Sequence, residues 1–202
     1  NVGKAHLEGF GSLEGVLHAK GELYEYLAST GGKAFVDGSD PVLMKRAGET
    51  GVERIVIGPR GTLPVQCRMA GQTPFLEVEV KMGGEQFRVS TGLVGGYNLQ
   101  KILFAVSAGY YFGIPAGMVR EAIAGYRPEN YRSQFIEGKQ NRVILDAYNA
   151  NPTSMRKAIS GLLEYASPPT LLILGDMAEI GNTSEQEHRE LLSWIKTMPV
   201  DR

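Results

Sequence analysis

The amino-acid sequence predicts an α/β protein built from two successive domains, the second of them Rossmann-like. Short apolar runs alternate with amphipathic segments along the chain, and glycines stand at the ends of many of these runs. Hydrophobic residues make up 43% of the 202 residues, which is enough for one or two globular cores. A polar segment over residues 127–134 interrupts the alternation. We therefore predict one domain over residues 1–135 and a second over residues 136–202.

The first predicted helix begins after Ser12, a residue type that caps helices. Its apolar positions recur at steps of three and four residues and predict one buried stripe. The stripe contains Leu13, Val16, Leu17, Leu23, Tyr24 and Leu27. A strand over 33–38, a helix opened by Asp40 and Pro41, and a buried strand over 54–58 follow in the order of a βαβ unit.

The pattern changes after residue 64. Apolar and polar residues alternate over 75–80 and 86–90, on either side of the turn sequence KMGG. This alternation predicts a β-hairpin with one solvated face. Two helices are predicted next, over 98–113 and 115–126, and a proline opens the second.

The second predicted domain returns to alternating strands and helices. Its elements, in order, are a strand pair over 134–148, a helix over 151–166, a buried strand over 170–175 and a helix over 184–196. Asn151 and Pro152 supply the cap and the first turn of the first of these helices.

Charge and cysteine content exclude several classes of partner. Lysine and arginine number 21 against 22 aspartate and glutamate residues, so there is no basic excess to bind nucleic acid or a membrane surface. No apolar run approaches the roughly 20 residues that a membrane span requires. The single cysteine, Cys67, excludes an internal disulfide and fits a reducing cytoplasm, where we expect the protein to be located.

Lys20 stands inside the predicted stripe, three residues after Leu17 and three before Leu23. Two interpretations are open. The ammonium group could reach solvent along its own aliphatic stem. Alternatively, it could be partly desolvated, which would favour a neutral and reactive amine.

Two further residues are candidates for ligand contacts. His6 lies in a glycine-rich stretch, where the backbone can approach a ligand and the imidazole can bind a metal, although a loop histidine is more often a surface residue. Asn98 stands at a predicted helix start, where capping is the simpler role. Its amide also carries the donor and acceptor pair that matches the edge of adenine.

Polar residues follow both predicted strands of the second domain. In open α/β sheets, ligands collect at the carboxyl ends of strands, and a helix N-terminus favours anions. Asp146, Tyr148 and Asn149 occupy such a position and are candidate ligand contacts. Asp176 and Glu179 follow the next predicted strand in the same way, with roles as cap and turn residues equally open.

Five motifs, taken together, resemble the Mur ligases over nearly the whole chain. They are NVGKAHLEGFGSLEGVLHAKGE, GGYNLQ, NYRSQ, DAYNANPTSM and LILGDMAEIG, of which the last two are the most specific. The resemblance implies the latter part of a Mur-ligase central ATPase domain, followed by the first part of a Rossmann-like C-terminal domain. It also implies an ATP-dependent ligase, with ATP and Mg²⁺ as cofactors. This branch of the family joins D-alanyl-D-alanine to UDP-N-acetylmuramoyl-tripeptide through an acyl phosphate, in peptidoglycan precursor synthesis.

The resemblance assigns roles residue by residue. His6 matches the magnesium-binding histidine, and Lys20 matches the lysine that becomes carbamylated and thus both catalytic and metal-facing. Asn98 matches the asparagine that contacts adenine. The remaining assignments are Arg132 as the hinge arginine near the nucleotide, Asp146 as the nucleotide-contacting acid, and Tyr148 and Asn149 as members of the same loop.

The chain departs from the family pattern at several points. Lys101 stands where a second asparagine is usual, and Tyr97 where histidine is common. No phosphate loop of the G-x-x-x-x-G-K-[ST] type occurs. That loop and the domain that binds the UDP-sugar would precede Asn1, so we expect a fragment that is inactive by itself.

Two alternative functions remain open at this point. One is another amide ligase of the same superfamily, such as a folylpolyglutamate synthetase. The other is a non-catalytic nucleotide-binding module.

Overall fold

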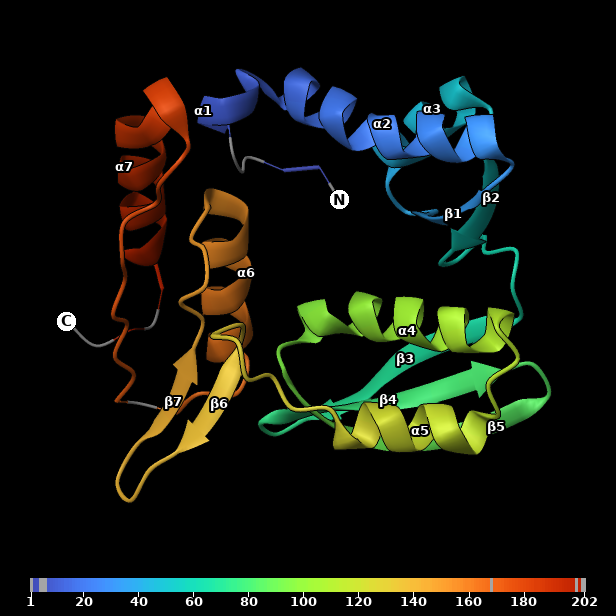
Figure 1. Ribbon diagram of the computed structural model, residues 1–202. Coiled ribbons are helices and arrows are strands. Elements are labelled where there is room, and N and C mark those ends of the chain that lie inside the picture. Colours follow the sequence, from blue (N-terminus) through green and yellow to red (C-terminus); the bar gives the residue numbers. More distant parts are fainter. Residues whose placement is uncertain (1, 4–6, 168, 199, 201–202) are drawn as a thin grey trace.

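The computed structural model describes residues 2–3, 7–167, 169–198 and 200, and its elements form three groups, each with a small sheet (Figure 1). The first group contains α1 (Leu7–Phe10), α2 (Leu13–Thr30), β1 (Lys33–Asp37), α3 (Pro41–Thr50) and β2 (Glu53–Ile57). β1 and β2 pair in parallel, as the predicted βαβ unit requires. Across the described residues, no helix is both long enough and apolar enough to cross a membrane.

The predicted helix starts of the first group are confirmed. Ser12 Oγ accepts the Gly15 N–H at 3.1 Å. The Asp40 carboxylate accepts the N–H groups of Val42 and Leu43, both at 3.0 Å. These side chains satisfy backbone donors that have no partner inside the helix.

The predicted apolar stripe of α2 is wrong in part. Val16 is buried, but Leu13 and Leu23 are 45% and 59% exposed. The second position that packing buries is Gly21, because the Arg46 side chain of α3 lies directly against it. Apolar residues occur on both sides of this helix, so the periodicity wrongly placed Leu13 and Leu23 on the buried side.

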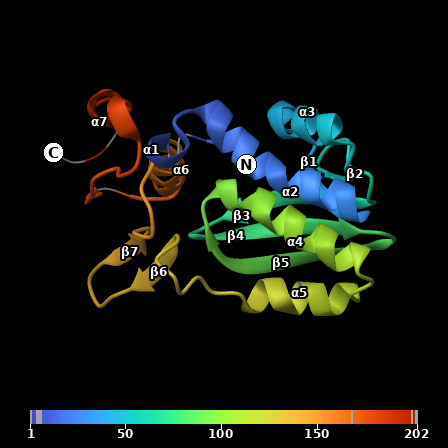
Figure 2. The same ribbon diagram turned by 45° about the horizontal axis from the view of Figure 1, so that its top comes forward.

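The middle group contains β3 (Val65–Gln72), β4 (Phe75–Met82), β5 (Glu85–Val94), η1 (Gly96–Asn98), α4 (Leu99–Tyr111) and α5 (Ala116–Gly125). The predicted hairpin is β4 and β5, and β3 adds a third antiparallel strand that the sequence did not predict. Leu76, Val78 and Val80 are fully buried on one face of β4. α4 and α5 contribute Ile102, Val106 and Val119 to the same core, alongside the sheet in Figure 2.

The last group contains β6 (Gln134–Glu137), β7 (Arg142–Leu145), α6 (Pro152–Leu163), η2 (Gly181–Thr183) and α7 (Ser184–Ile195). β6 and β7 form the predicted antiparallel pair. Asn151 caps α6 through a capping box with Ser154, as expected from the sequence. The division of the chain at residues 135 and 136 stays a prediction.

The predicted buried strand over 170–175 is wrong. The residues described there form no strand, and Leu171 and Ile173 are 78% and 89% exposed. Only Leu172 of this apolar run packs against the core of α6 and α7. A strand needs a hydrogen-bonding neighbour as well as an apolar composition, and β6 and β7 pair with each other instead.

Candidate functional site

Asn98 is fixed inside the turn that joins β5 to α4. Its side chain is 1% exposed, and Nδ2 donates a hydrogen bond to the Val94 carbonyl at 2.7 Å. Within the described chain this side chain makes no capping hydrogen bond, so the capping interpretation is wrong. The amide instead closes the turn between the strand end and the helix, and its contact with adenine stays a prediction.

Tyr97 connects this turn with the last group of elements. Its hydroxyl forms a 2.7 Å hydrogen bond with Ser133 Oγ. A Cβ at Gly161 of α6 would lie 2.9 Å from the Tyr97 ring, which shows how closely the helix packs on it. Burial of the ring raises the pKa of Tyr97 above its usual value. Tyr97 thus joins η1 and α6 to the polar segment over residues 127–134, which we call the hinge segment.

The hinge segment positions Asp146. The Ser133 N–H donates to Asp146 Oδ1 at 3.1 Å. The N–H of Ala147 donates to the Tyr131 carbonyl at 2.8 Å. Tyr131 and Ser133 both have positive φ, a conformation that costs free energy and persists only where contacts enforce it. The loop after β7 is therefore held against the hinge.

Lys101, Arg132 and Lys157 bring positive charge to the region of this acid. The Arg132 guanidinium lies 3.9 Å from the centre of the Tyr148 ring. Burial lowers the pKa of Lys101, and the nearby charges of Arg132 and Lys157 lower it further, while Asp146 opposes the shift. The cluster therefore has more positive than negative charge, which suits a phosphate-bearing ligand.

The structure brings most of the predicted nucleotide contacts to one place. Asn98, Arg132, Asp146 and Tyr148 lie at the junction of the middle and last groups, and Asn149 lies exposed in the same loop. The sequence interpretation missed Ser133 and Lys157 as members of this cluster. Ser133 lies in the motif NYRSQ, but its contacts with Tyr97 and Asp146 join residues distant in sequence, and Lys157 acts through its charge near Lys101.

Lys20 lies elsewhere, on the exposed face of α2. It borders a hollow of about 290 Å³ that is also lined by Leu17, Gly21 and Arg46. The inference that packing desolvates this lysine is therefore wrong, and the interpretation in which it reaches solvent is confirmed. Tyr24 and Leu27 of the stripe do pack against the core of β1 and α3, but Lys20 lies outside this contact.

His6 lies outside the described residues. Among the residues that are described, no group of three histidine, cysteine or acidic side chains is arranged to hold a metal ion. The metal roles of His6 and Lys20 therefore stay predictions.

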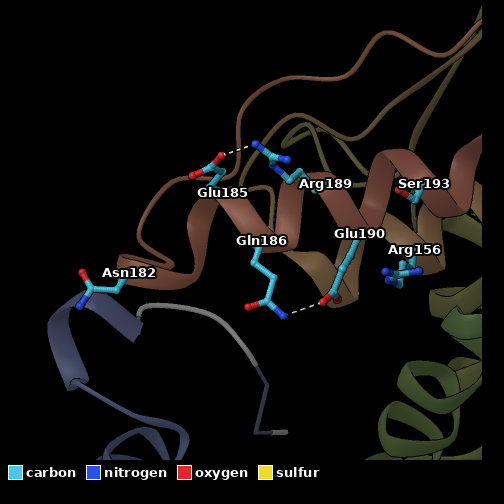
Figure 3. A pocket seen from close by; sticks show the side chains of 7 residues that line it. All are labelled: Arg156, Asn182, Glu185, Gln186, Arg189, Glu190 and Ser193. Carbon is cyan, nitrogen blue, oxygen red and sulfur yellow. Dashed lines mark hydrogen bonds and ion pairs between the residues drawn. The ribbon is translucent and has the colours of Figure 1, made fainter.

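A larger hollow of about 650 Å³ is lined by residues of η2 and α7 and by Arg156 of α6 (Figure 3). Four of the side chains that line it form pairs along α7. Arg189 bonds Glu185 at 2.6 Å, and Gln186 donates to Glu190 at 2.8 Å. These pairs are exposed and have the geometry of ordinary surface contacts one helical turn apart. We therefore place the candidate site at the cluster formed by Asn98, Lys101, Arg132, Asp146 and Tyr148, which we call the hinge cluster, and not at this larger hollow.

Comparison with known proteins provides independent information. Residues 1–109 match the family described as Mur ligase middle domain, and residues 131–202 match that described as Mur ligase, glutamate ligase domain. The UDP-N-acetylmuramoyl-tripeptide–D-alanyl-D-alanine ligases of Bacillus subtilis and Escherichia coli are 28% and 29% identical to the chain over its whole length. A crystal structure of MurF from Acinetobacter baumannii covers the whole chain with a TM-score of 0.85 and 26% identity.

These relatives are longer than this chain. The chain spans 44% and 45% of the two curated relatives and 44% of the crystallised protein.

Proposed function

Because the chain belongs to the Mur ligase family, we propose that it forms part of an ATP-dependent peptide ligase of the MurF type. The enzyme joins D-alanyl-D-alanine to UDP-N-acetylmuramoyl-tripeptide in the synthesis of peptidoglycan precursors. The two relatives with this activity, each similar over the whole chain, support this choice of substrates. The location that follows is the cytoplasm, where the single cysteine of the chain, Cys67, would stay reduced.

The proposed reaction has two steps. An oxygen of the tripeptide carboxylate attacks the γ-phosphorus of ATP, and ADP leaves. The neutral amine of D-alanyl-D-alanine then attacks the acyl carbon, inorganic phosphate leaves and the nitrogen loses a proton. The first step brings a carboxylate to the triphosphate, and the second releases phosphate, so preorganised positive charge is the main requirement of the site.

The observation that carries the proposal is the hinge cluster, where the predicted nucleotide contacts lie close together. In this proposal Asn98 contacts adenine, and Arg132 and Asp146 contact the rest of the nucleotide. Lys101 and Lys157 add positive charge beside them, which offsets phosphate charge. Ser133 orients Asp146 through its backbone N–H, so the acid is held in place before the nucleotide binds.

Lys20 acts in a different way in this proposal. The exposed ammonium group first loses one proton. The free amine then adds carbon dioxide through a new bond between nitrogen and carbon, which gives a carbamate and releases a second proton. This converts a cation into an anion that, together with His6, would hold Mg²⁺. The magnesium ion would supply further neutralisation of phosphate charge when bound.

Phosphate release by the complete enzyme that contains this chain tests the function. We expect release from ATP that requires both UDP-N-acetylmuramoyl-tripeptide and D-alanyl-D-alanine. D-Glutamate or L-glutamate in place of the dipeptide should give only the background rate. Release that depends on glutamate would favour another amide ligase, and ATP binding without release would favour a nucleotide-binding module.

A further inference from the structure

The larger hollow, lined by η2, α7 and Arg156 of α6, differs from the hinge cluster in its charge. Its volume of about 650 Å³ falls within the range of about 300–1,000 Å³ found for small-molecule sites. Two arginines and two glutamates line it, so their formal charges cancel. A nucleotide needs a positive excess, and this hollow does not supply one. The ligand that it does suit follows from how these four charges are paired.

Two of the four charges neutralise each other. Arg189 Nη2 lies 2.6 Å from Glu185 Oε1, one helical turn away on α7. In Figure 3 this pair lies on one side of α7, whereas Glu190 and Arg156 lie on the other side. The charges left for a ligand are therefore one carboxylate and one guanidinium.

Arg156 presents a guanidinium that has no acidic partner. This group lies 5.1 Å from the centre of the Trp194 ring, and within the described chain it forms no ion pair. Contact with a ring occupies one face of the guanidinium and leaves the N–H groups at its edge free to donate. A carboxylate can accept two of these N–H groups in parallel. Trp194 thus holds the Arg156 guanidinium in an orientation that suits a ligand carboxylate.

Glu190 presents a carboxylate that has no cationic partner. Its Oε1 accepts a hydrogen bond from the Gln186 amide at 2.8 Å, and no described residue forms an ion pair with it. The neutral amide orients the carboxylate but leaves its charge uncompensated. A ligand ammonium group would supply the missing charge and has three N–H groups to donate.

The spacing of α6 and α7 suits a ligand with the length of a dipeptide. The two helices share a core through Ile159 and Leu191. The axes of packed helices lie about 8–10 Å apart. A dipeptide in an extended conformation spans about 7 Å. Its two charged ends can therefore reach Glu190 on α7 and Arg156 on α6 at the same time.

We propose that this hollow binds the zwitterionic dipeptide substrate, with Arg156 on its carboxylate and Glu190 on its ammonium group. The choice of D-alanyl-D-alanine as this dipeptide rests on the proposed function. Arg156 directly precedes Lys157, so α6 borders both this hollow and the hinge cluster. Glutamate carries a second carboxylate, for which the described lining of the hollow has no second unpaired cation. The pairing of charges therefore also selects against glutamate.

Titration of the ¹⁵N-labelled chain with D-alanyl-D-alanine, followed by nuclear magnetic resonance, tests this proposal. We expect the amide signals of α7 and of the residues around Arg156 to shift, with a dissociation constant of about 1 mM. N-Acetyl-D-alanyl-D-alanine lacks the ammonium group, and D-alanyl-D-alaninamide lacks the carboxylate. Each of these, and D-glutamate, should bind at least about tenfold more weakly than the dipeptide.

Variants assign each end of the dipeptide to its residue. Arg156→Gln should weaken dipeptide binding at least about tenfold but leave binding of the amide unchanged, because the amide has no carboxylate to lose. Glu190→Gln should likewise weaken binding of the dipeptide but not that of the N-acetyl form. Arg142→Gln is the matched control and should have no effect, because this arginine of β7 has a side chain that is 74% exposed and pairs with Glu137.

The absence of shifts at these residues with about 10 mM dipeptide would overturn the proposal, as would equal affinity for the dipeptide, its two blocked forms and D-glutamate. The blocked forms decide the matter on the unchanged chain even if a variant fails to fold. Phosphate release by the complete enzyme separates this site from the ligase function. Release that requires the dipeptide, with the same KM for it in Arg156→Gln, would support the function and overturn the site.

Discussion

Gly161 is the residue at which α6 approaches the Tyr97 ring most closely. A Cβ at this position would lie 2.9 Å from the ring and 3.3 Å from the Gly95 Cα. Interiors are packed so densely that an added methyl group without space forces a shift. The absence of a side chain at Gly161 is therefore what allows Tyr97 to reach Ser133.

We expect Gly161→Ala to lower the free energy of unfolding by about 1–3 kcal/mol, because overpacking outweighs the better helix propensity of alanine. Urea denaturation of the chain measures this change. Gly125→Ala is the matched control, since Gly125 also lies at the end of a helix but a Cβ there would meet nothing within 4 Å. A Gly161→Ala variant as stable as the Gly125→Ala variant would show that the packing is loose.

Ionisation of the Tyr165 hydroxyl should lower the stability of the chain at alkaline pH. Its hydroxyl is buried and finds no hydrogen-bond partner among the described residues. Burial, with a smaller contribution from Tyr97, raises the pKa of Tyr165 from 10.0 to about 12. Between these values the unfolded state loses the proton while the folded state keeps it, so ionisation favours unfolding.

Stability should therefore fall as the pH rises from 10 toward 12. Tyr165→Phe should remove about 1 kcal/mol of this fall, a value reduced because solvent screens the exposed part of the side chain. Urea denaturation at a series of pH values provides the comparison. If the free energy of unfolding falls equally steeply with pH in the variant and in the unchanged chain, Tyr165 does not cause the loss.

Helix ends were the elements most accurately predicted from the sequence. Ser12, Asp40 and Asn151 cap helices through hydrogen bonds to residues only two or three positions away. A local pattern is sufficient for such contacts. β3 was missed although it pairs with β4 across the short turn at Thr73 and Pro74, because its regular alternation is broken by an irregularity between Met69 and Gly71.

The segment over 170–175 shows the converse error. Its apolar run satisfied the composition of a buried strand, but the strand also depends on a neighbour that the sequence does not identify. The burial of Lys20 was also predicted wrongly. Which residues of α2 are buried depends on packing against Arg46 of α3, and periodicity does not show this contact. Composition and periodicity therefore indicated the elements, and packing determined which faces they bury.

Because Ile173 is 89% exposed, Ile173→Lys should change the free energy of unfolding by no more than about 0.5 kcal/mol. Leu191→Ala provides the contrast, since Leu191 is 3% exposed and its truncation should cost about 2–4 kcal/mol. Thermal or urea unfolding of both variants measures the difference. A large loss of stability in Ile173→Lys would mean that the residue is buried.

At the scale of the whole molecule, the hinge cluster depends on contacts between distant parts of the chain. Phe75 of β4 and Phe135 of β6 pack edge to face with centres 5.1 Å apart, beside the hydrogen bond of Tyr97 to Ser133. The family resemblance identified Asn98, Arg132 and Asp146, because each lies in a recognisable motif. It assigned no role to Ser133, although Ser133 lies in the same motif as Arg132, and none to Lys157, because both roles depend on how the two regions pack.

The affinity of the complete enzyme for ADP with Mg²⁺ tests the central claim most directly, namely that the hinge cluster binds the nucleotide. Isothermal titration calorimetry should show binding that Asp146→Asn and Arg132→Gln each weaken at least about tenfold, the loss expected for a charge-assisted contact. Glu137→Gln is the control, because this exposed residue of β6 faces Arg142 and should leave the affinity unchanged. Full ADP affinity in folded Asp146→Asn and Arg132→Gln variants would contradict the claim.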